Sequence, residues 1–389
     1  MTRTALRLGF VPLLDAAPLI VAREMGFAEA QGLDLTLRPA PSWASLRDMA
    51  LWGQVEAAQM LAPVPVAIAM GLAGPVERLD ILQVLSVNGD VLGVSAALEA
   101  RLRAQGFGFD FADALAARAA LAAAVEGPLR IGVPFPFSTH VALVRHWLAQ
   151  EAPPYSLHTI PPPRMAEALA EGEIDAFCVG EPWGSVAVER GAGALILPGT
   201  AIWAAAPEKV LAARPSWVAD NPETVAQLMR AVWLAGRWMD DPANRVTVAD
   251  LLARSEHVNA PPELLDRALR GQMVISSRGE ERRVPGMIRF HEGAAPFPWR
   301  SQAAWFARQL ARDNGLDPNA AMAAAGAICR TDLYRANLRG IGADLPGASS
   351  RIEGALEHPT AVASERGTMI LPRDAFFDRT IFDPAQPDC

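Results

Sequence analysis

The sequence predicts an α/β protein of two lobes with a ligand cleft between them, followed by a mainly helical carboxy-terminal part. Three observations support this fold class. Strand and helix patterns alternate with short connections over residues 5–87, a second such series follows Asn88-Gly89, and the pattern becomes mainly helical from about residue 215. Strands that alternate with helices are typical of mostly parallel sheets covered on both faces.

The first series predicts four strands and three helices. Ser42 is a good helix cap, and Gly26 and Gly53 stand where two of the helices should end. The strands are buried or alternate at period two. They are expected at ALRLGFV (5–11), LDLTLRP (33–39), VEAAQML (55–61) and LDILQVLSV (79–87), and the helices at 15–26, 42–53 and 64–71.

The second series predicts strands at LRIGVPF (129–135), YSLHTI (155–160) and IDAFCV (174–179). Its helices are expected at 114–125, 138–149, 164–172 and 181–191, and the clearest later helix at 221–242, with an irregular chain after about 340. We therefore expect residues 1–88 to form the first part of lobe 1 and 89–200 to form lobe 2. Residues 201–389 should return to lobe 1 and add the helices and tail.

Composition excludes several classes of function. The net charge of −8 and the lack of a basic tract argue against direct nucleic-acid binding. No apolar run reaches the roughly 18–20 residues of a membrane helix, and the amino terminus lacks a secretory-signal pattern. Three scattered cysteines (Cys178, Cys329, Cys389) fit reduced thiols. A cytoplasmic location is expected.

Motifs for catalysis and cofactors are missing from the sequence. It contains no GxGxxG, P-loop or GxSxG, and HEGAA (291–295) lacks the second histidine of a zinc-protease helix. His140 and His146 are six residues apart, which places them on different faces of a helix. We therefore expect no metal, no cofactor and no enzymatic activity.

Lys209, in AAAPEKVLAAR (204–214), is the only lysine in the chain. Either composition explains this, or position 209 requires a compact ammonium that arginine cannot replace. Other candidate donors are His140, the Trp43 indole, and the backbone N–H groups of Trp43 and Ala44 in a first helical turn, where anions bind. Three charges are expected to be solvated or capping and receive no role: Asp15, Arg47 and Asp48.

Several stretches in order resemble the nitrate/bicarbonate substrate-binding proteins of ABC importers, the NrtA/CmpA-like family. They include LGFVPLLDAAPLIVAREMGF (8–27), PSWASLRDM (41–49), AAQMLAPVP (57–65), VNGD (87–90), FPFSTH (135–140), PPPRM (161–165), FCVGEPW (177–183), PEK (207–209) and the tail block 332–367. The resemblance implies the bilobed type II periplasmic-binding-protein fold. One branch of this family, NasS, is a cytoplasmic nitrate/nitrite sensor that holds the RNA-binding antiterminator NasT.

The resemblance also implies a ligand site. By position, the family's anion-binding residues become Trp43, Ala44, Asp90, His140 and Lys209, with a second shell at Ser42, Gln59 and Glu181. The bicarbonate branch replaces the lysine with an acid that helps to hold calcium, whereas this chain keeps lysine.

Asp90 departs from the family, which has glutamine there. A carboxylate within a few ångströms of nitrate costs on the order of 1–4 kcal/mol. Either Asp90 pairs with Lys209 or protonated His140, or the ligand carries a proton, as bicarbonate does. A third alternative is that Asp90 faces away and caps the Asn88-Gly89 turn.

The resulting expectation is a cytoplasmic nitrate/nitrite sensor that releases a NasT-like antiterminator when the anion binds. The alternative is the solute-binding component of an ABC importer for nitrate, bicarbonate or another small oxyanion. A pyrimidine-precursor synthase on the same fold would require a His and Cys cluster that the sequence does not show.

Overall fold

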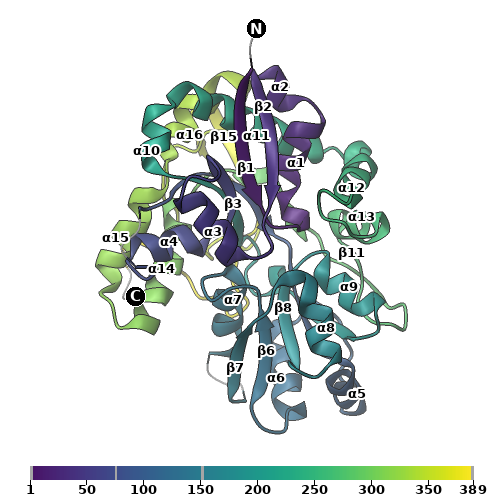
Figure 1. Ribbon diagram of the computed structural model, residues 1–389. Coiled ribbons are helices and arrows are strands. Elements are labelled where there is room, and N and C mark those ends of the chain that lie inside the picture. Colours follow the sequence, from purple (N-terminus) through teal and green to yellow (C-terminus); the bar gives the residue numbers. More distant parts are fainter. Residues whose placement is uncertain (1–2, 75–76, 150–152, 387–389) are drawn as a thin grey trace.

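Two β-sheets, one above the other in Figure 1, organise the chain. The computed structural model describes residues 3–74, 77–149 and 153–386. The upper sheet has the order β13-β4-β10-β3-β1-β2 and the lower sheet β7-β6-β8-β5-β9. The strands are β1 (Thr4–Phe10), β2 (Leu33–Pro39), β3 (Ala57–Leu61), β4 (Asp80–Asn88), β5 (Asp90–Ser95), β6 (Leu129–Val133), β7 (Tyr155–Thr159), β8 (Ala176–Gly180), β9 (Gly193–Pro198), β10 (Pro207–Ala213) and β13 (Ile288–Arg289).

Both sheets are mixed and not mostly parallel as predicted, although most strands of each sheet run in the same direction. Strands β1 to β4 run in one direction, because β2 and β3 are parallel to β1, and β3 and β4 are both antiparallel to β10. In the lower sheet, β6 to β9 share one direction and β5 opposes them. Strands β5 and β10 are antiparallel to both of their neighbours. Each of them follows a point where the chain crosses from one sheet to the other.

Helices cover the sheets close to the predicted positions. They are α1 (Ala17–Glu24), α2 (Phe27–Ala30), α3 (Trp43–Leu51), α4 (Pro63–Ala69), α5 (Ala96–Ala104), α6 (Ala114–Ala124), α7 (Thr139–Leu148), α8 (Met165–Ala170), α9 (Trp183–Glu189), α10 (Pro215–Asp220), α11 (Pro222–Met239), α12 (Arg245–Ala253), α13 (Pro262–Arg270), α14 (Arg300–Asn314), α15 (Pro318–Ile328) and α16 (Thr331–Leu338). The predicted helix 15–26 starts instead as a 3-10 turn over Leu14–Ala16. Gly26 follows its end in the left-handed region, with φ of 75°.

Strands β5, β9 and β10 were not predicted from the sequence. Each is a buried run without period-two alternation, which periodicity alone does not assign to a strand. The tail expected to be irregular contains a hairpin of β14 (Thr360–Ser364) and β15 (Gly367–Leu371). A second hairpin, β11 (Gln272–Val274) with β12 (Glu281–Arg283), follows α13.

The chain crosses between the sheets at Gly89 and again over residues 199–206. Asn88 joins the two crossings, because its amide donates to the Ala204 carbonyl (3.0 Å) and accepts from the Ala206 N–H (3.0 Å). Asn88 has φ of 63° and Gly89 has φ of 107°, and these are the two residue types that adopt the left-handed region most readily. The crossings are therefore fixed side by side.

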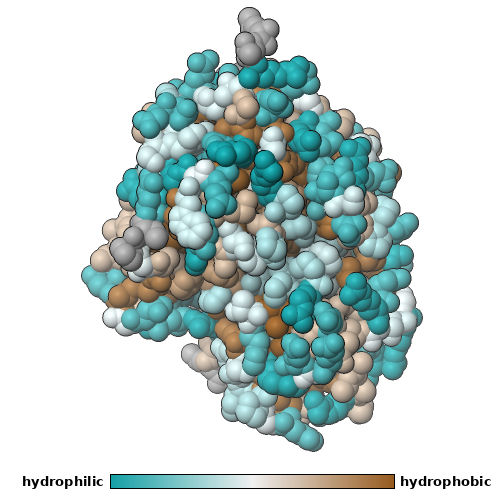
Figure 2. Space-filling model, viewed as in Figure 1, coloured by the Kyte–Doolittle hydropathy of each residue, from teal (hydrophilic) through white to brown (hydrophobic). Residues whose placement is uncertain are grey.

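The later part of the chain contacts both sheets. Helix α11 packs on α1 and α14 on α4, beside the upper sheet. The β11–β12 segment reaches the lower sheet, where the Leu195 N–H donates to the Ile275 carbonyl at 2.8 Å and Arg103 pairs with Glu280. The face in Figure 2 is mainly hydrophilic, with small brown patches. Within the described residues, no helix combines the length and apolarity that a bilayer crossing needs. Cys178 and Cys329 are buried free thiols, and Cys389 lies outside the described residues.

Candidate functional site

Lys209 is completely buried at the junction of the two sheets, on β10. Pro207 pairs with Val87 and Lys209 pairs with Ser86, so Glu208 is an extra residue on β10, a β-bulge. Consecutive residues of a regular strand point to opposite faces, but a bulge changes that alternation. The Lys209 ammonium consequently contacts the carboxylate of its neighbour Glu208.

Asp15 is the second partner of Lys209, with its Oδ2 at 2.7 Å from Nζ. It is 2% exposed, and Gln59 donates to its other oxygen. Gln59 is itself oriented by the Val11 N–H, which donates to its carbonyl at 2.9 Å. The expectation that Asp15 is solvated or capping is therefore wrong. The turn after β1 places this carboxylate in the site and not at the surface.

His140 and Asp90 enter the site from the lower lobe. Ser138 caps α7 by accepting from the Val141 N–H, and His140 follows in the first turn, fully buried. Its Nε2 lies 2.9 Å from Asp90 Oδ1 and its Nδ1 lies 3.3 Å from Glu208 Oε1. Of the alternatives for Asp90, the structure has it facing into the site and paired with His140.

These five residues form one sequence of alternating charges, which we call the ion chain: Asp15, Lys209, Glu208, His140 and Asp90. Asp15, Glu208 and Lys209 come from the upper sheet and its loops, whereas His140 and Asp90 belong to the lower lobe. The ion chain therefore spans the junction between the lobes.

Trp43 and its neighbours cover the upper end of the ion chain. Ser42 caps α3 by accepting from the Ser45 N–H at 3.2 Å, which makes Trp43 and Ala44 the first two helical residues. The Trp43 ring lies 5.3 Å from Lys209 Nζ, close enough for a cation–π contact. Its indole Nε1 is buried and has no hydrogen-bond partner among the described residues, so it remains a donor for a ligand.

Glu181, predicted for the second shell, is buried beside the ion chain. Its backbone joins both lobes, because its carbonyl accepts from Leu14 and its N–H donates to Gly89. One carboxyl oxygen accepts from the Ser185 N–H at 3.3 Å. The other has no partner in the described part of the chain, as is also true of Asp90 Oδ2 and Glu208 Oε2. Buried polar atoms rarely remain unpaired, so this group indicates a place for a proton or a ligand.

Burial and charge together set the protonation of the site. Burial lowers the pKa of Lys209 and His140, but the neighbouring carboxylates outweigh it and raise both pKa values. Burial likewise raises the pKa of Asp90, but His140, together with Lys209 and Glu208, outweighs burial and lowers it. For Glu208 and Glu181 burial dominates and raises the pKa to about 7.

At neutral pH the site therefore has no excess of positive charge. Three carboxylates of the ion chain face two cations, which gives a formal charge of −1 when all are ionised and zero when Glu208 is protonated. An anion that enters adds a further negative charge. Uptake of a proton by Glu208 would compensate for it.

A cation site is a second chemical possibility, which the spacing of the histidines and cysteines in the sequence did not predict. Asp90, His140 and Glu208 offer ligand atoms within 4.8 Å of one another. These are ordinary ligand types for a divalent metal. The Glu208 oxygen that faces His140 also contacts the Lys209 ammonium, so a metal ion would have to displace that ammonium.

The sequence residues predicted for the ligand site thus converge, although their roles in binding stay predictions. Trp43, Lys209, His140 and Asp90 lie within one connected set of contacts, and Ala44 lies next to Trp43 on α3. Glu208 and Asp15 were missed. The signal for Glu208 was its place inside the PEK motif, whereas nothing local distinguished Asp15.

Comparison with known proteins gives three related results. Residues 1–253 match the NMT1-like family. The nitrate/nitrite binding protein NrtA of Nostoc sp. PCC 7120 is 27% identical over 99% of this chain and 84% of its own length. The nitrate import ATP-binding protein NrtC of Synechocystis sp. PCC 6803 is 33% identical over 80% of this chain, but the chain spans only 46% of NrtC.

A solved structure agrees with these sequence matches. The periplasmic nitrate-binding protein NrtA from Synechocystis PCC 6803 superposes with a TM-score of 0.84 at 26% identity. The superposition covers 99% of this chain and 97% of that protein. The predicted bilobed binding-protein fold is confirmed.

Proposed function

The chain belongs to the NMT1-like family, and on that premise we propose that it binds a small oxyanion such as nitrate or bicarbonate, as the solute-binding component of an importer. The proposed site is the ion chain with Trp43 and Ala44. The fold supports this assignment, because a ligand held between two lobes can bring them together.

The observation that carries the proposal is the meeting of Lys209 and His140 at the lobe junction. Lys209 comes from β10 of the upper sheet and His140 from helix α7 of the lower lobe, each is fully buried, and both contact Glu208. Burying two cationic side chains costs free energy unless partners compensate for it. A site that keeps them next to an unpaired indole N–H has the donors that an oxyanion needs.

The charge balance narrows the chemistry of the ligand. Nitrate brings one negative charge and no proton, and the raised pKa of Glu208 makes this carboxyl the group that would take up a proton when nitrate binds. Bicarbonate brings its own proton and could donate it to the unpaired Asp90 oxygen. We propose that the protein binds an anion together with one proton, which either comes with the ligand, as in bicarbonate, or is taken up by Glu208.

Titration calorimetry tests this proposal directly. Nitrate, nitrite and bicarbonate are titrated at pH 7.5 in two buffers that differ in ionisation enthalpy, which reports the protons taken up. We expect nitrate or nitrite to bind with uptake of close to one proton, and bicarbonate with much less. No binding of any of the three by the parent protein, at concentrations up to millimolar, would contradict the proposal.

The sensor role, the NasT-like partner and the cytoplasmic location remain proposals that rest on the motif resemblance alone. For the anion to release a partner, it must bind the partner-free form more tightly. Size-exclusion chromatography with a NasT-like protein, with and without nitrate, distinguishes the two roles. Co-elution that nitrate abolishes supports the sensor, whereas separate elution in both conditions supports the importer component.

A further inference from the structure

A cavity outside the ion chain lies beside the second crossing of the chain, residues 199–206. It has a volume of about 510 Å³, and small-molecule sites have roughly 300–1,000 Å³. Its walls come from the lower lobe at 111–112, from the crossing, from the segment 283–292 and from the tail. No residue of the ion chain lines it.

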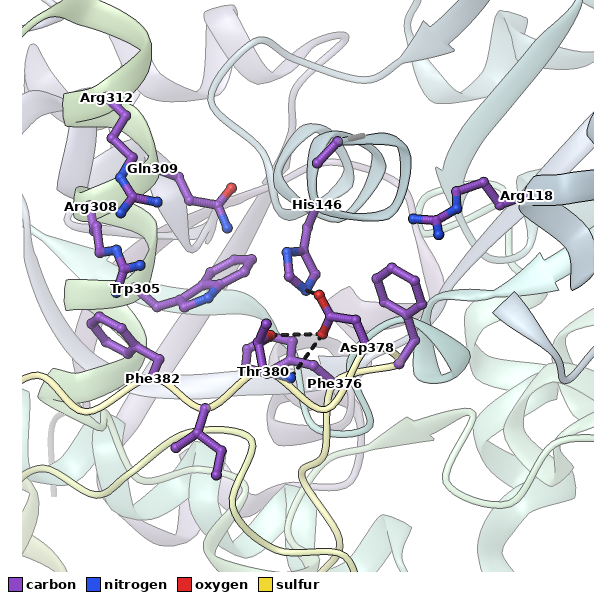
Figure 3. Close-up of a pocket in the computed structure, with 13 residues that line it drawn as sticks. Arg118, His146, Trp305, Arg308, Gln309, Arg312, Phe376, Asp378, Thr380 and Phe382 are labelled. Carbon is purple, nitrogen blue, oxygen red and sulfur yellow. Dashed lines mark hydrogen bonds and ion pairs between the residues drawn. The ribbon is translucent and has the colours of Figure 1, made fainter. Parts of the chain in front are cut away.

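The tail that forms one wall of this cavity is attached to both the crossing and the lower lobe. The Phe377 N–H donates to the Ile202 carbonyl of the crossing at 2.9 Å. The next residue, Asp378, lies 3.5 Å from His146 of α7, which points toward it in Figure 3. The wall that the tail contributes at Pro372 is therefore held in place.

Arg289, on β13, lines the cavity and is partly buried without a counter-ion. Its Nη2 donates to the Ala204 carbonyl at 3.2 Å, and among the described residues it forms no other hydrogen bond and no ion pair. Burial lowers the pKa of Arg289, and the charge of Glu292 offsets only part of this effect. A guanidinium has five N–H donors. Most of them are therefore available to a ligand.

The other charges of the cavity leave room for one anionic group. Arg373 already pairs with Glu357 at 3.8 Å. Arg283 is exposed and forms no ion pair within the described ranges, and Glu292 is the acid among the lining residues. Arg283 and Arg289 therefore exceed the negative charge of the lining by one. A monoanion would neutralise this excess, whereas a dianion would reverse it.

The position of the Arg289 guanidinium depends on Gly286. A Cβ atom at Gly286 would come within 2.6 Å of Nη2 and 2.7 Å of Nε, so the guanidinium can lie against the backbone there only because this residue is glycine. Gly286 also has φ of 68°, in the left-handed region that favours glycine. An arginine held in this way loses little freedom when a ligand binds, which favours affinity.

Much of the remaining lining is apolar and rigid. Phe111 is buried with φ of 61°, a conformation that is uncommon for a bulky residue and is found mainly where the surroundings enforce it. A proline ring presents apolar surface and has almost no side-chain entropy to lose. The lining prolines are Pro198, Pro285, Pro359 and Pro372. A flat apolar ring suits such walls.

We propose that this cavity binds an aromatic monocarboxylate, with the carboxylate on Arg289 and the ring among the prolines. The guanidinium fork matches the two oxygens of a carboxylate. A single negative charge restores the charge balance of the lining, and the rigid apolar walls take the ring. Such a ligand would contact the crossing, the lower lobe and the tail together.

Titration calorimetry of the full-length protein with benzoate, benzamide and acetate tests this proposal. Benzamide keeps the ring and removes the charge, whereas acetate keeps the charge and removes the ring. We expect benzoate to bind. Benzamide and acetate should each bind at least about tenfold more weakly, because each lacks one of the two contacts.

Variants on two walls of the cavity add a second test. Arg289→Gln removes the cation and should weaken benzoate binding by about tenfold or more. Ala112→Trp, on the lower lobe, should weaken it by filling the cavity. Arg38→Gln changes an exposed arginine on β2, at the opposite edge of the upper sheet from β13, and should have no effect. Cooperative urea unfolding shows that each variant is folded, and if Arg289→Gln does not fold, Ala112→Trp and the three probes decide.

Benzoate binding should stay the same in an excess of nitrate, because the ion chain does not line this cavity. This readout separates the proposal from the oxyanion function, and the benzoate result can be read whether or not nitrate binds. Four results would overturn the proposal. They are no benzoate binding at millimolar concentration, benzamide or acetate binding as tight as benzoate, competition by nitrate, and benzoate affinity that either folded cavity variant leaves unchanged.

Discussion

Replacing Lys209 by methionine should destabilise the protein strongly and in a pH-dependent manner. Methionine fills much of the same volume but leaves Asp15 and Glu208 buried without their shared cation. Removing one partner of a buried ion pair typically costs about 3–5 kcal/mol. We expect a loss of this size in the free energy of unfolding at pH 8.

The geometry gives the same magnitude. Lys209 Nζ and Asp15 Oδ2 are 2.7 Å apart, which corresponds to about 6 kcal/mol for unit charges at an effective dielectric of 20. The variant can limit the loss by protonating Asp15. That costs about 1.4 kcal/mol per pH unit above an ordinary pKa of about 3.9, or about 5–6 kcal/mol at pH 8. Methionine, unlike lysine, has no desolvation cost when buried, and this offsets part of the loss. The net decrease in the free energy of unfolding is then about 3–5 kcal/mol.

The sign of the pH dependence follows from the stranded acids. Without Lys209 their folded pKa values lie above the unfolded ones, so the folded variant binds more protons than the unfolded chain. Its stability is then highest below about pH 4 and falls as pH rises through the folded pKa values. At pH 5 the protonation cost of Asp15 is only about 1.5 kcal/mol, and the gap to the parent protein should narrow accordingly.

Urea unfolding followed by tryptophan fluorescence at pH 5, 6.5 and 8 measures these differences. The comparison includes Lys209→Met, the double variant Asp15→Asn/Lys209→Met, and Arg38→Met as a surface control. The double variant should recover most of the loss, because the stranded Asp15 carboxylate is gone. A loss below about 1 kcal/mol at pH 8, or one that is equal at all three pH values, would refute the reasoning.

Three further predictions concern ligand binding. His140→Ala should weaken nitrate binding by about 10- to 150-fold, as expected for a hydrogen bond to a charged ligand. His146→Ala, on the same helix, should leave nitrate affinity unchanged. Equal effects of the two variants would show that His140 is not part of the ligand site. Asp90→Gln should raise nitrate affinity about tenfold and lower that for bicarbonate, and unchanged calorimetric titrations of both would show that Asp90 does not contact the ligand. Nitrate affinity should fall as pH rises through about 7, where Glu208 loses the proton that the bound anion requires. In the Glu208→Gln protein, nitrate affinity should depend much less on pH. A parent protein whose nitrate affinity is constant between pH 6 and 8 would exclude a proton at Glu208.

Sequence patterns predicted the α/β fold of two lobes, whereas the ligand-binding role of the site residues stays a prediction. Helix-capping and glycine signals are local in sequence. The capping residues Ser42 and Ser138 therefore predict that Trp43 and His140 lie in the first turn of their helices. The resemblance then grouped these residues with Lys209 and Asp90, which the structure places in one connected set of contacts.

The missed carboxylates depend on features that local patterns do not encode. Glu208 faces the site only because β10 is bulged, and a regular strand would turn it away from Lys209. Asp15 lies in a short 3-10 turn, where an acidic residue is usually solvated. Its burial results from contacts with Gln59 and Lys209, which lie 44 and 194 residues further along the chain.

The paired crossings at Gly89 and 199–206 have a mechanical consequence. A body attached at one point can rotate about three axes, but one attached by two adjacent strands bends freely only about the line through both attachments. Asn88 hydrogen-bonds across the pair, which resists shear between them. The lobes should therefore hinge mainly about this line, with the β11–β12 segment on the lower sheet as a further restraint, and Asp90, one residue beyond the pivot, should move the least. His140, carried on a helix further from the pivot in sequence, is the residue whose approach to Lys209 reports how far the hinge has turned.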